Sequence, residues 1–306
     1  MARTKKNTPK VAHVFPGQGS QRVGMGKEAY ETSAAARKVF KQADDALGFS
    51  LSNLCFEGPE EELNLTYNAQ PAILTTSLAC WKASEEKGLW KSMGRPVYAA
   101  GHSMGEYTSL VVANVVDFQA AVRLVWERGK AMHTAGAQSP GGMLAILGIE
   151  EAVIHDICRQ SGAQIANVNC PGQVVISGTN EAIARATELA RERGEGKVIP
   201  LKVSGAFHSA LMEPAVKDLN HVITSTPFRD PEIPIIANTS ARPMFKAAEL
   251  KQELLIQLCH CVQWQRSVEY MINEGIATFI EVGPGRVLTG LIKRIDANVA
   301  TMEVPA

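Results

Sequence analysis

Hydrophobic positions along the chain fall into short runs typical of buried strands and longer runs with helical spacing. The strand-like runs are VAHVF (11–15), PVYAA (96–100), IPIIAN (233–238) and ATFIEV (277–282). Helical patterns lie between them, among them residues 247–258 and 262–274, and a further helix is expected after Gly285. Strands that alternate with helices indicate an α/β fold, with a parallel sheet covered by helices on its faces.

Residues 138–203 follow a second pattern. The strand-like segments are GGMLAILG, AQIANV, QVVISG and KVIPLKV, and the helical ones are EEAVIHDICRQ and NEAIARATELARERG, with Asn180 expected as an N-cap. The order β-α-β-β-α-β is the split βαβ, or ferredoxin-like, arrangement. We expect a flexible tail at 1–10, a large α/β subdomain from 11–137 and 204–306, and an inserted small subdomain at 138–203. A ligand site is expected in the cleft between the two subdomains.

Charge and composition narrow the function classes. The chain carries 31 basic and 31 acidic side chains, so nothing favours general attraction to nucleic acid or a membrane surface. The longest apolar stretch, residues 110–116, is far shorter than the roughly 20 residues of a membrane span. The basic N-terminus has no apolar run behind it and is no secretory signal, although a trimmed organellar precursor stays a second interpretation. We expect a cytoplasmic protein that binds neither nucleic acid nor membranes.

The sequence Cys259-His260-Cys261 resembles part of a metal site. The chain has six cysteines, none with CxxC spacing, and no second ligand cluster accompanies this one. We expect reduced, inert thiols and no metal.

The strongest chemical signal is GHSMG at 101–105. It directly follows the strand PVYAA and directly precedes the helical run EYTSLVVANVV, which is the context of a nucleophile elbow. Gly101 and Gly105 allow the sharp turn that exposes the Ser103 hydroxyl. The alternative is a glycine-rich turn with an incidental serine, and the strand–turn–helix context favours the nucleophile.

Among the seven histidines, His208 is the candidate base for that serine. It lies in a loop between the strand KVIPLKV and the helix ALMEPAVKDL, where the helix dipole keeps an imidazole neutral. His155 and His221 lie inside predicted helices, and His102 is expected to point away from Ser103. A purely structural loop histidine is the competing interpretation.

Two further motifs have open alternatives. FPGQGSQ (15–21) follows the first strand and is either an anion-cradling turn or an ordinary strand–helix turn; it lacks the GxGxxG of a dinucleotide site. Arg128 falls on the apolar stripe of the predicted helix DFQAAVRLVWERGKAM. A guanidinium on that stripe either holds a carboxylate or phosphate bidentately, or reaches an internal partner or solvent.

Taken together, these motifs resemble a known family. FPGQGSQ, GHSMGEY, WERG, GAFHSALM, QLCHCVQW and EVGPGRVLTGL occur in the order found in malonyl-CoA:acyl carrier protein transacylases, and the resemblance covers Val11 to Leu291. It implies an α/β-hydrolase-like large subdomain with a ferredoxin-like insert. The family's roles then fall on Ser103 (nucleophile), His208 (base), the Gln18 and Met104 amides (oxyanion hole), Arg128 (substrate carboxylate) and the Gln257 main-chain carbonyl (orientation of His208). Asn169 matches a recurrent motif without an assigned role.

The resemblance also implies an activity. Malonyl would pass from malonyl-CoA to the phosphopantetheine thiol of acyl carrier protein, in fatty acid or polyketide biosynthesis. The route would be a ping-pong mechanism through malonyl-Ser103, without metal or redox cofactor, and we expect a monomer. GAFH at 205–208 and Met104 are typical of members that select malonyl over methylmalonyl. One alternative is a serine esterase or thioesterase, but the histidine of such enzymes usually lies near the C-terminus, and they have no use for Arg128. The other alternative is a non-catalytic carrier-binding subunit.

Overall fold

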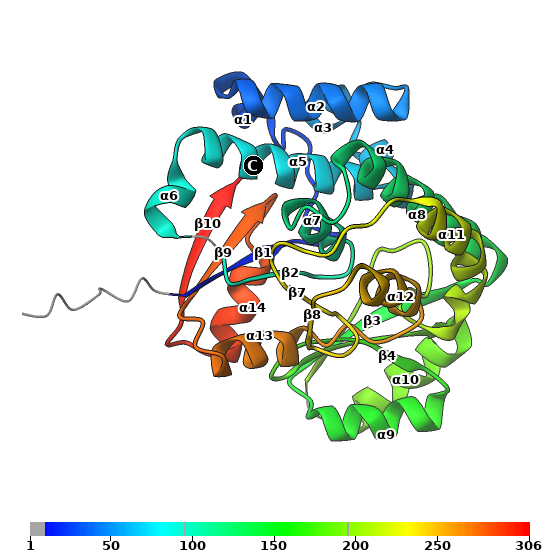
Figure 1. The fold of residues 1–306 in the computed structure, drawn as a ribbon. Helices are drawn as coiled ribbons and strands as arrows, with labels where there is room; N and C mark the ends of the chain where they lie inside the picture. The colour runs from blue at the N-terminus through cyan, green and yellow to red at the C-terminus, as the bar shows by residue number, and fades with distance from the viewer. Residues whose placement is uncertain (1–9, 95, 195) are drawn as a thin grey trace, which may run out of the picture.

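The computed structural model describes residues 10–94, 96–194 and 196–306, so all of the expected tail except Lys10 lies outside the described residues. A six-stranded sheet forms the centre of the larger part of the molecule (Figure 1). In spatial order its strands are β10 (Ala300–Pro305), β9 (Thr278–Gly283), β1 (Val11–Phe15), β2 (Tyr98–Gly101), β7 (Ile235–Ile236) and β8 (Pro243–Met244). All neighbours are parallel except β8, which is antiparallel to β7. The fold is therefore α/β with a mixed, mainly parallel sheet.

Helices cover both faces of this sheet. Before β2 they are α1 (Lys27–Thr32), α2 (Ala34–Leu47), α3 (Leu51–Glu57), α4 (Glu60–Asn64), α5 (Thr66–Glu86) and α6 (Leu89–Met93). After β2 they are α7 (Gly105–Val112), α8 (Phe118–Gln138), the short 3₁₀ helix η1 (Ala210–Met212), α11 (Glu213–Ser225), α12 (Ala247–Gln257), α13 (Trp264–Asn273) and α14 (Val287–Ile295).

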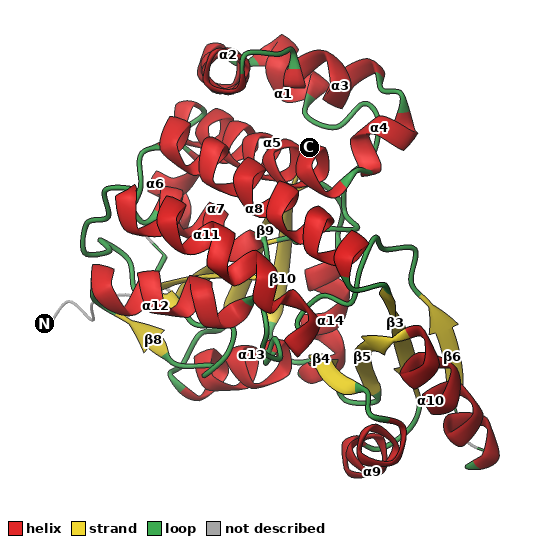
Figure 2. Cartoon of the chain, turned by 90° about the vertical axis from the view of Figure 1, so that its right-hand side faces the viewer, coloured by secondary structure: helices red, strands yellow, loops and turns green. Residues whose placement is uncertain are grey.

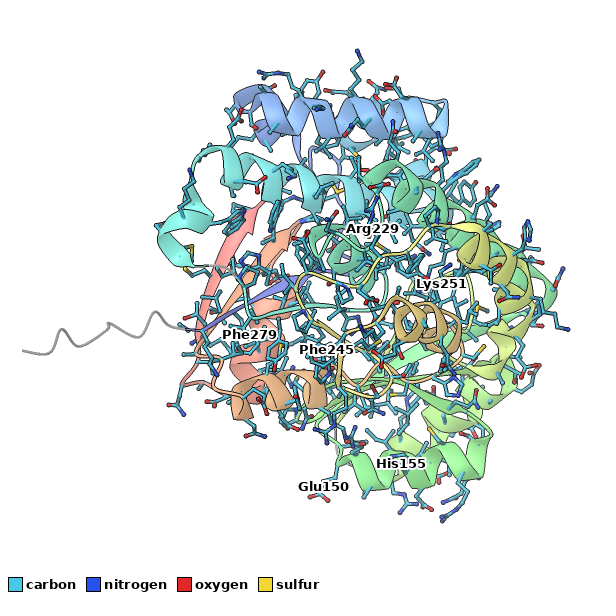
Figure 3. The ribbon with its side chains drawn as sticks, viewed as in Figure 1. Glu150, His155, Arg229, Phe245, Lys251 and Phe279 are labelled. Atoms are coloured by element: carbon cyan, nitrogen blue, oxygen red, sulfur yellow. The ribbon has the colours of Figure 1, made fainter. Side chains whose placement is uncertain are left out.

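The residues of β1 alternate between the two helical layers. Val11 and Phe15 belong to the core formed with α2, α5, α7 and α8, whereas Ala12 and Val14 belong to the core formed with α13 and α14. Phe279 of β9, which is 1% exposed, lies among the side chains that fill the second layer (Figure 3). Burial on both faces is why these strands are continuous apolar runs in the sequence.

A four-stranded sheet with two helices forms the smaller part, visible as a separate lobe in Figure 2. Its elements are β3 (Gly141–Leu147), α9 (Glu151–Ser161), β4 (Gln164–Cys170), β5 (Gln173–Thr179), α10 (Asn180–Glu192) and β6 (Lys197–Pro200). The spatial order is β4-β5-β3-β6, with every neighbouring pair antiparallel. Main-chain hydrogen bonds join this lobe to the larger part, since Val262 accepts from Val168 at 2.9 Å and donates to Ala166 at 2.8 Å.

Several local expectations needed correction. The N-cap of α10 is Thr179 and not Asn180: the Thr179 hydroxyl accepts a hydrogen bond from the Ala182 amide at 3.1 Å, because the chain leaves β5 at Thr179 with an extended conformation. The pattern at 233–238 yields only the two-residue strand β7, and β8 and β10 were not predicted at all. In the parts of the chain that the structure describes, no helix is long and apolar enough to cross a membrane.

Candidate active site

Ser103 occupies the sharp turn between β2 and α7. Its φ of 51° lies in the left-handed region, which a serine adopts only under constraint from its surroundings. Glycine is required on both sides: a Cβ on Gly101 would lie 1.9 Å from the carbonyl carbon of Gly105, and a Cβ on Gly105 would lie 2.1 Å from the Phe15 oxygen. The turn is therefore packed directly against the end of β1, with the serine at its apex.

Asn238 fixes this turn from the neighbouring strand. Its side-chain oxygen accepts from the Ser103 amide and its side-chain nitrogen donates to the Gly101 carbonyl, both at 2.7 Å. Asn238 is 2% exposed and follows β7, which pairs with β2. Two main-chain groups of the strained turn thus obtain buried hydrogen-bond partners, which stabilise its conformation.

His208 reaches the serine from the loop before η1. The Ser103 hydroxyl lies 2.8 Å from His208 Nε2, and His208 Nδ1 lies 2.8 Å from the main-chain oxygen of Gln257. A carbonyl can only accept, so Nδ1 carries the proton and Nε2 has the free lone pair. This tautomer orients the ring to take a proton from the serine hydroxyl.

The His208 ring is neutral at ordinary pH. Burial lowers its pKa to about 3, with a further lowering by the positive charge of Arg128. A neutral ring was also expected from the sequence, on the ground of a helix dipole, whereas the causes in the structure are burial and the neighbouring guanidinium.

Arg128 is buried beside the serine and is only 1% exposed. Its guanidinium donates to Gln70 Oε1 at 2.8 Å, to Gln257 Oε1 at 3.0 Å and to the Ser103 hydroxyl at 3.3 Å. Within the described residues it forms no salt bridge with a carboxylate. The guanidinium also lies over the Tyr107 ring, 5.2 Å from its centroid. A desolvated cation whose hydrogen-bond partners are neutral oxygens is a favourable site for an anionic group next to the serine.

The two candidate oxyanion donors lie on either side of the nucleophile turn. Met104 follows the serine, and Gln18 belongs to the loop after β1, which touches the turn so closely that a Cβ on Gly17 would be 2.4 Å from the His102 oxygen. Neither the Gln18 nor the Met104 amide donates to a main-chain carbonyl within residues 10–94, 96–194 and 196–306. Both amides are therefore available as hydrogen-bond donors.

Two groups considered from the sequence lie outside this arrangement. The His102 ring is turned to the small lobe, where Nε2 lies 2.8 Å from the Asn169 side-chain oxygen. Cys259 and Cys261 are half-buried free thiols, and no cluster of His, Cys, Asp or Glu in the described part of the chain could hold a metal ion.

Three polar residues in the site were not singled out from the sequence: Gln70, Asn238 and Glu106. Each is at most 2% exposed. Glu106 falls inside the GHSMGEY motif, but nothing in the sequence reveals the partners of these three side chains.

The chain matches the acyl transferase domain family over residues 12–304. It is 47% identical over 300 residues to the malonyl CoA-acyl carrier protein transacylase of Bacillus subtilis, covering 96% of this chain and 93% of that protein. The Escherichia coli protein of the same name is 42% identical over 289 residues, covering 93% of this chain and 92% of the relative.

Solved structures agree with the sequence relatives. An acyl carrier protein S-malonyltransferase from Vibrio cholerae superposes with a TM-score of 0.93 at 40% identity, covering 97% of both chains. A malonyl-transacylase in complex with a type II polyketide synthase acyl-carrier protein gives a TM-score of 0.92 at 39% identity, covering 96% of this chain and 95% of the other.

Proposed function

Since the chain belongs to the malonyl-CoA:acyl carrier protein transacylases of the acyl transferase domain family, we propose that it transfers malonyl from malonyl-CoA to the phosphopantetheine thiol of an acyl carrier protein. The observation that carries the proposal is the Ser103–His208 pair at 2.8 Å with the buried Arg128 guanidinium beside it. Both relatives named above are malonyl transacylases, and one structural neighbour is bound to a carrier protein, which supports this pair of substrates.

In the first half-reaction, the Ser103 hydroxyl attacks the thioester carbonyl while His208 Nε2 takes its proton. The Gln18 and Met104 amides donate to the oxyanion that forms, and Arg128 binds the free malonyl carboxylate. Collapse of the tetrahedral intermediate breaks the carbon–sulfur bond. The CoA thiolate leaves with the proton from His208, and malonyl stays on the serine as an ester.

The second half-reaction is the same path in reverse. The phosphopantetheine thiol gives its proton to His208 and attacks the malonyl ester; Ser103 then leaves and recovers the proton. One thioester is exchanged for another, so the proposed reaction requires no metal and no redox cofactor. All the proposed groups come from one chain, so a monomer is sufficient.

A serine esterase or thioesterase is the second candidate, because the serine and histidine alone would serve hydrolysis. Arg128 argues against it. A buried guanidinium directed at the nucleophile has no role towards a simple ester, whereas it matches the free carboxylate of a malonyl group.

We assign the domain organisation on the same basis. The larger part is proposed as an α/β-hydrolase-like subdomain formed by residues 11–137 and 204–306, with a ferredoxin-like subdomain inserted at 138–203. The nucleophile turn after a central parallel strand supports the first assignment. The order β4-β5-β3-β6 with two helices supports the second.

Intact-mass spectrometry after mixing with malonyl-CoA tests the proposed function. The wild-type chain is expected to gain one malonyl group, and Ser103→Ala is expected to gain none. Initial rates with varied malonyl-CoA and carrier are expected to give parallel double-reciprocal lines, as a ping-pong mechanism requires. Intersecting lines together with an unlabelled serine would exclude the mechanism.

A further inference from the structure

Glu106 is a fully buried carboxyl group that the proposed reaction does not use. It is 0% exposed and lies on the first turn of α7, three residues after Ser103. One carboxyl oxygen, Oε2, accepts a hydrogen bond from the side-chain nitrogen of Gln257, and the other, Oε1, has no hydrogen-bond partner among the described residues. Burying a carboxyl group is unfavourable, so its place beside the nucleophile points to a function.

The contact of Glu106 determines how the Gln257 amide is oriented. The Gln257 side-chain nitrogen donates both to Glu106 and, at 3.1 Å, to the Ser103 carbonyl, while its oxygen accepts from Arg128 at 3.0 Å. An amide turned by 180° would place its NH₂ group against the guanidinium, which has only donors, and its oxygen against two acceptors. Glu106 and the Ser103 carbonyl therefore select the end of the amide that faces Arg128.

This orientation matters most once the serine is acylated. Formation of an ester converts the Ser103 hydroxyl oxygen, which accepts a hydrogen bond from Arg128, into an ester oxygen, which is a poorer acceptor. Among the described residues, the oxygens of Gln70 and Gln257 are then the stronger acceptors for the guanidinium, which also lies over the Tyr107 ring, 5.2 Å from its centroid. Within the described residues, the nitrogen of the Gln70 amide donates just one weak hydrogen bond, to the Met132 sulfur at 3.4 Å, so the Gln257 contact is the better defined of the two.

We propose that Glu106 is a positioning residue for malonyl selection: by fixing the Gln257 amide, it holds Arg128 where the guanidinium meets the malonyl carboxylate. The inference rests on the proposed function, because it takes Arg128 as the group that binds this carboxylate. Glu106 contributes a hydrogen-bond acceptor and does not need to be charged. Burial, and the like charge of Glu253 on α12, raise the pKa of Glu106 well above its usual value, and the opposing effect of Arg128 is smaller.

The test compares kcat/KM for malonyl-CoA and acetyl-CoA. Glu106→Leu, which removes the acceptor that fixes the Gln257 amide, is expected to lower the malonyl-to-acetyl ratio about tenfold or more, the effect of losing the hydrogen bond between Gln257 and the charged Arg128. Glu106→Gln keeps a carbonyl oxygen and is expected to hold the ratio within about threefold of wild type. Glu281→Gln is the matched control: Glu281 is 1% exposed but accepts from the Leu288 and Thr289 amides, away from Arg128, so the ratio is expected to stay unchanged.

Two outcomes would overturn the inference. The first is an unchanged malonyl-to-acetyl ratio in Glu106→Leu: with both rates at the wild-type level, Arg128 does not depend on Glu106, and with an equal loss for both donors, Glu106 is purely structural. The second is a Glu106→Gln variant as impaired in ratio as Glu106→Leu, which would rule out the acceptor role. If Glu106→Leu does not fold, Gln257→Leu removes the same amide from the other side, and an unchanged ratio there is equally decisive.

Arg128→Ala, measured alongside, separates this inference from the proposed function. A wild-type ratio in Arg128→Ala would refute the role of the arginine itself. A reduced ratio in Arg128→Ala with a wild-type ratio in Glu106→Leu would refute only the role of Glu106.

Discussion

Replacing Arg128 by alanine separates a malonyl transferase from a general acyl transferase. The guanidinium is 1% exposed, its hydrogen bonds run to neutral oxygens, and it contacts the nucleophile hydroxyl at 3.3 Å. A malonyl carboxylate bound there is desolvated and depends on this single cation. Removing one partner of such a pair costs about 2–5 kcal/mol, which corresponds to a loss of about 30-fold to 4000-fold in kcat/KM for malonyl-CoA.

Acetyl-CoA has no carboxylate, so its transfer is expected to hold steady or to rise in Arg128→Ala. Arg128→Lys is expected to be intermediate, because an ammonium cannot donate to both carboxylate oxygens in the planar geometry of a guanidinium. The assay is kcat/KM for both donors in wild type and both variants, with circular dichroism to confirm folding. An equal loss for malonyl and acetyl would mean that Arg128 supports the site's structure and does not bind the substrate carboxylate.

Two further predictions concern histidines. His208→Ala is expected to lower the rate of malonyl transfer about 10²–10⁴-fold. His155 lies on the outer surface of α9 (Figure 3), so His155→Ala is expected to leave the rate unchanged. Equal rates in wild type and His208→Ala would refute the assignment of the base. Burial lowers the pKa of His13 to about 4, so the unfolded chain binds a proton there from about pH 6.5 downwards while the folded chain does not. The free energy of unfolding is therefore expected to fall by about 1.4 kcal/mol for each unit that the pH drops from 6.5 to 4, about 3 kcal/mol in all. Denaturant titrations at several pH values are expected to show that the free energy of unfolding of His13→Gln depends on pH less steeply than that of wild type, by this amount. The same pH dependence in both proteins would contradict the prediction.

The sequence predicts the buried half of the fold better than its edges. β1 and β9 were recognised because strands buried on both faces are continuous apolar runs. β10 was missed because it lies at the edge of the sheet, where most of its side chains are exposed or half-buried, so its strand conformation depends on main-chain pairing with β9. The N-cap of α10 shows a finer limit: Thr179 and Asn180 are both good capping residues, and the backbone path out of β5 decides between them.

In the candidate site, the sequence predicts the residues that belong to local motifs but not the distant residues that hold them in place. Ser103 follows from a local motif and Arg128 from its register on a helix, since both signals are contained within a few turns of chain. The partners that hold them come from distant segments: Gln70 is 58 residues from Arg128, and Asn238 is 135 residues from Ser103. Periodicity reports which face of an element is buried but not which polar groups meet there, so these residues emerge only from the folded structure.

Arg128 has a second effect in the proposed mechanism, because its charge acts on the base as well as on the substrate. Burial, with a smaller contribution from this positive charge, holds the pKa of His208 at about 3 in the free protein, which leaves the ring a weak base. A malonyl carboxylate bound to the guanidinium neutralises that charge, so the pKa of His208 rises towards the range in which an imidazole removes a proton efficiently. Acetyl-CoA brings no such charge and leaves His208 at its lowered pKa. In the proposed mechanism the same ion pair therefore favours malonyl at two points, once in binding and once in the proton transfer that activates Ser103.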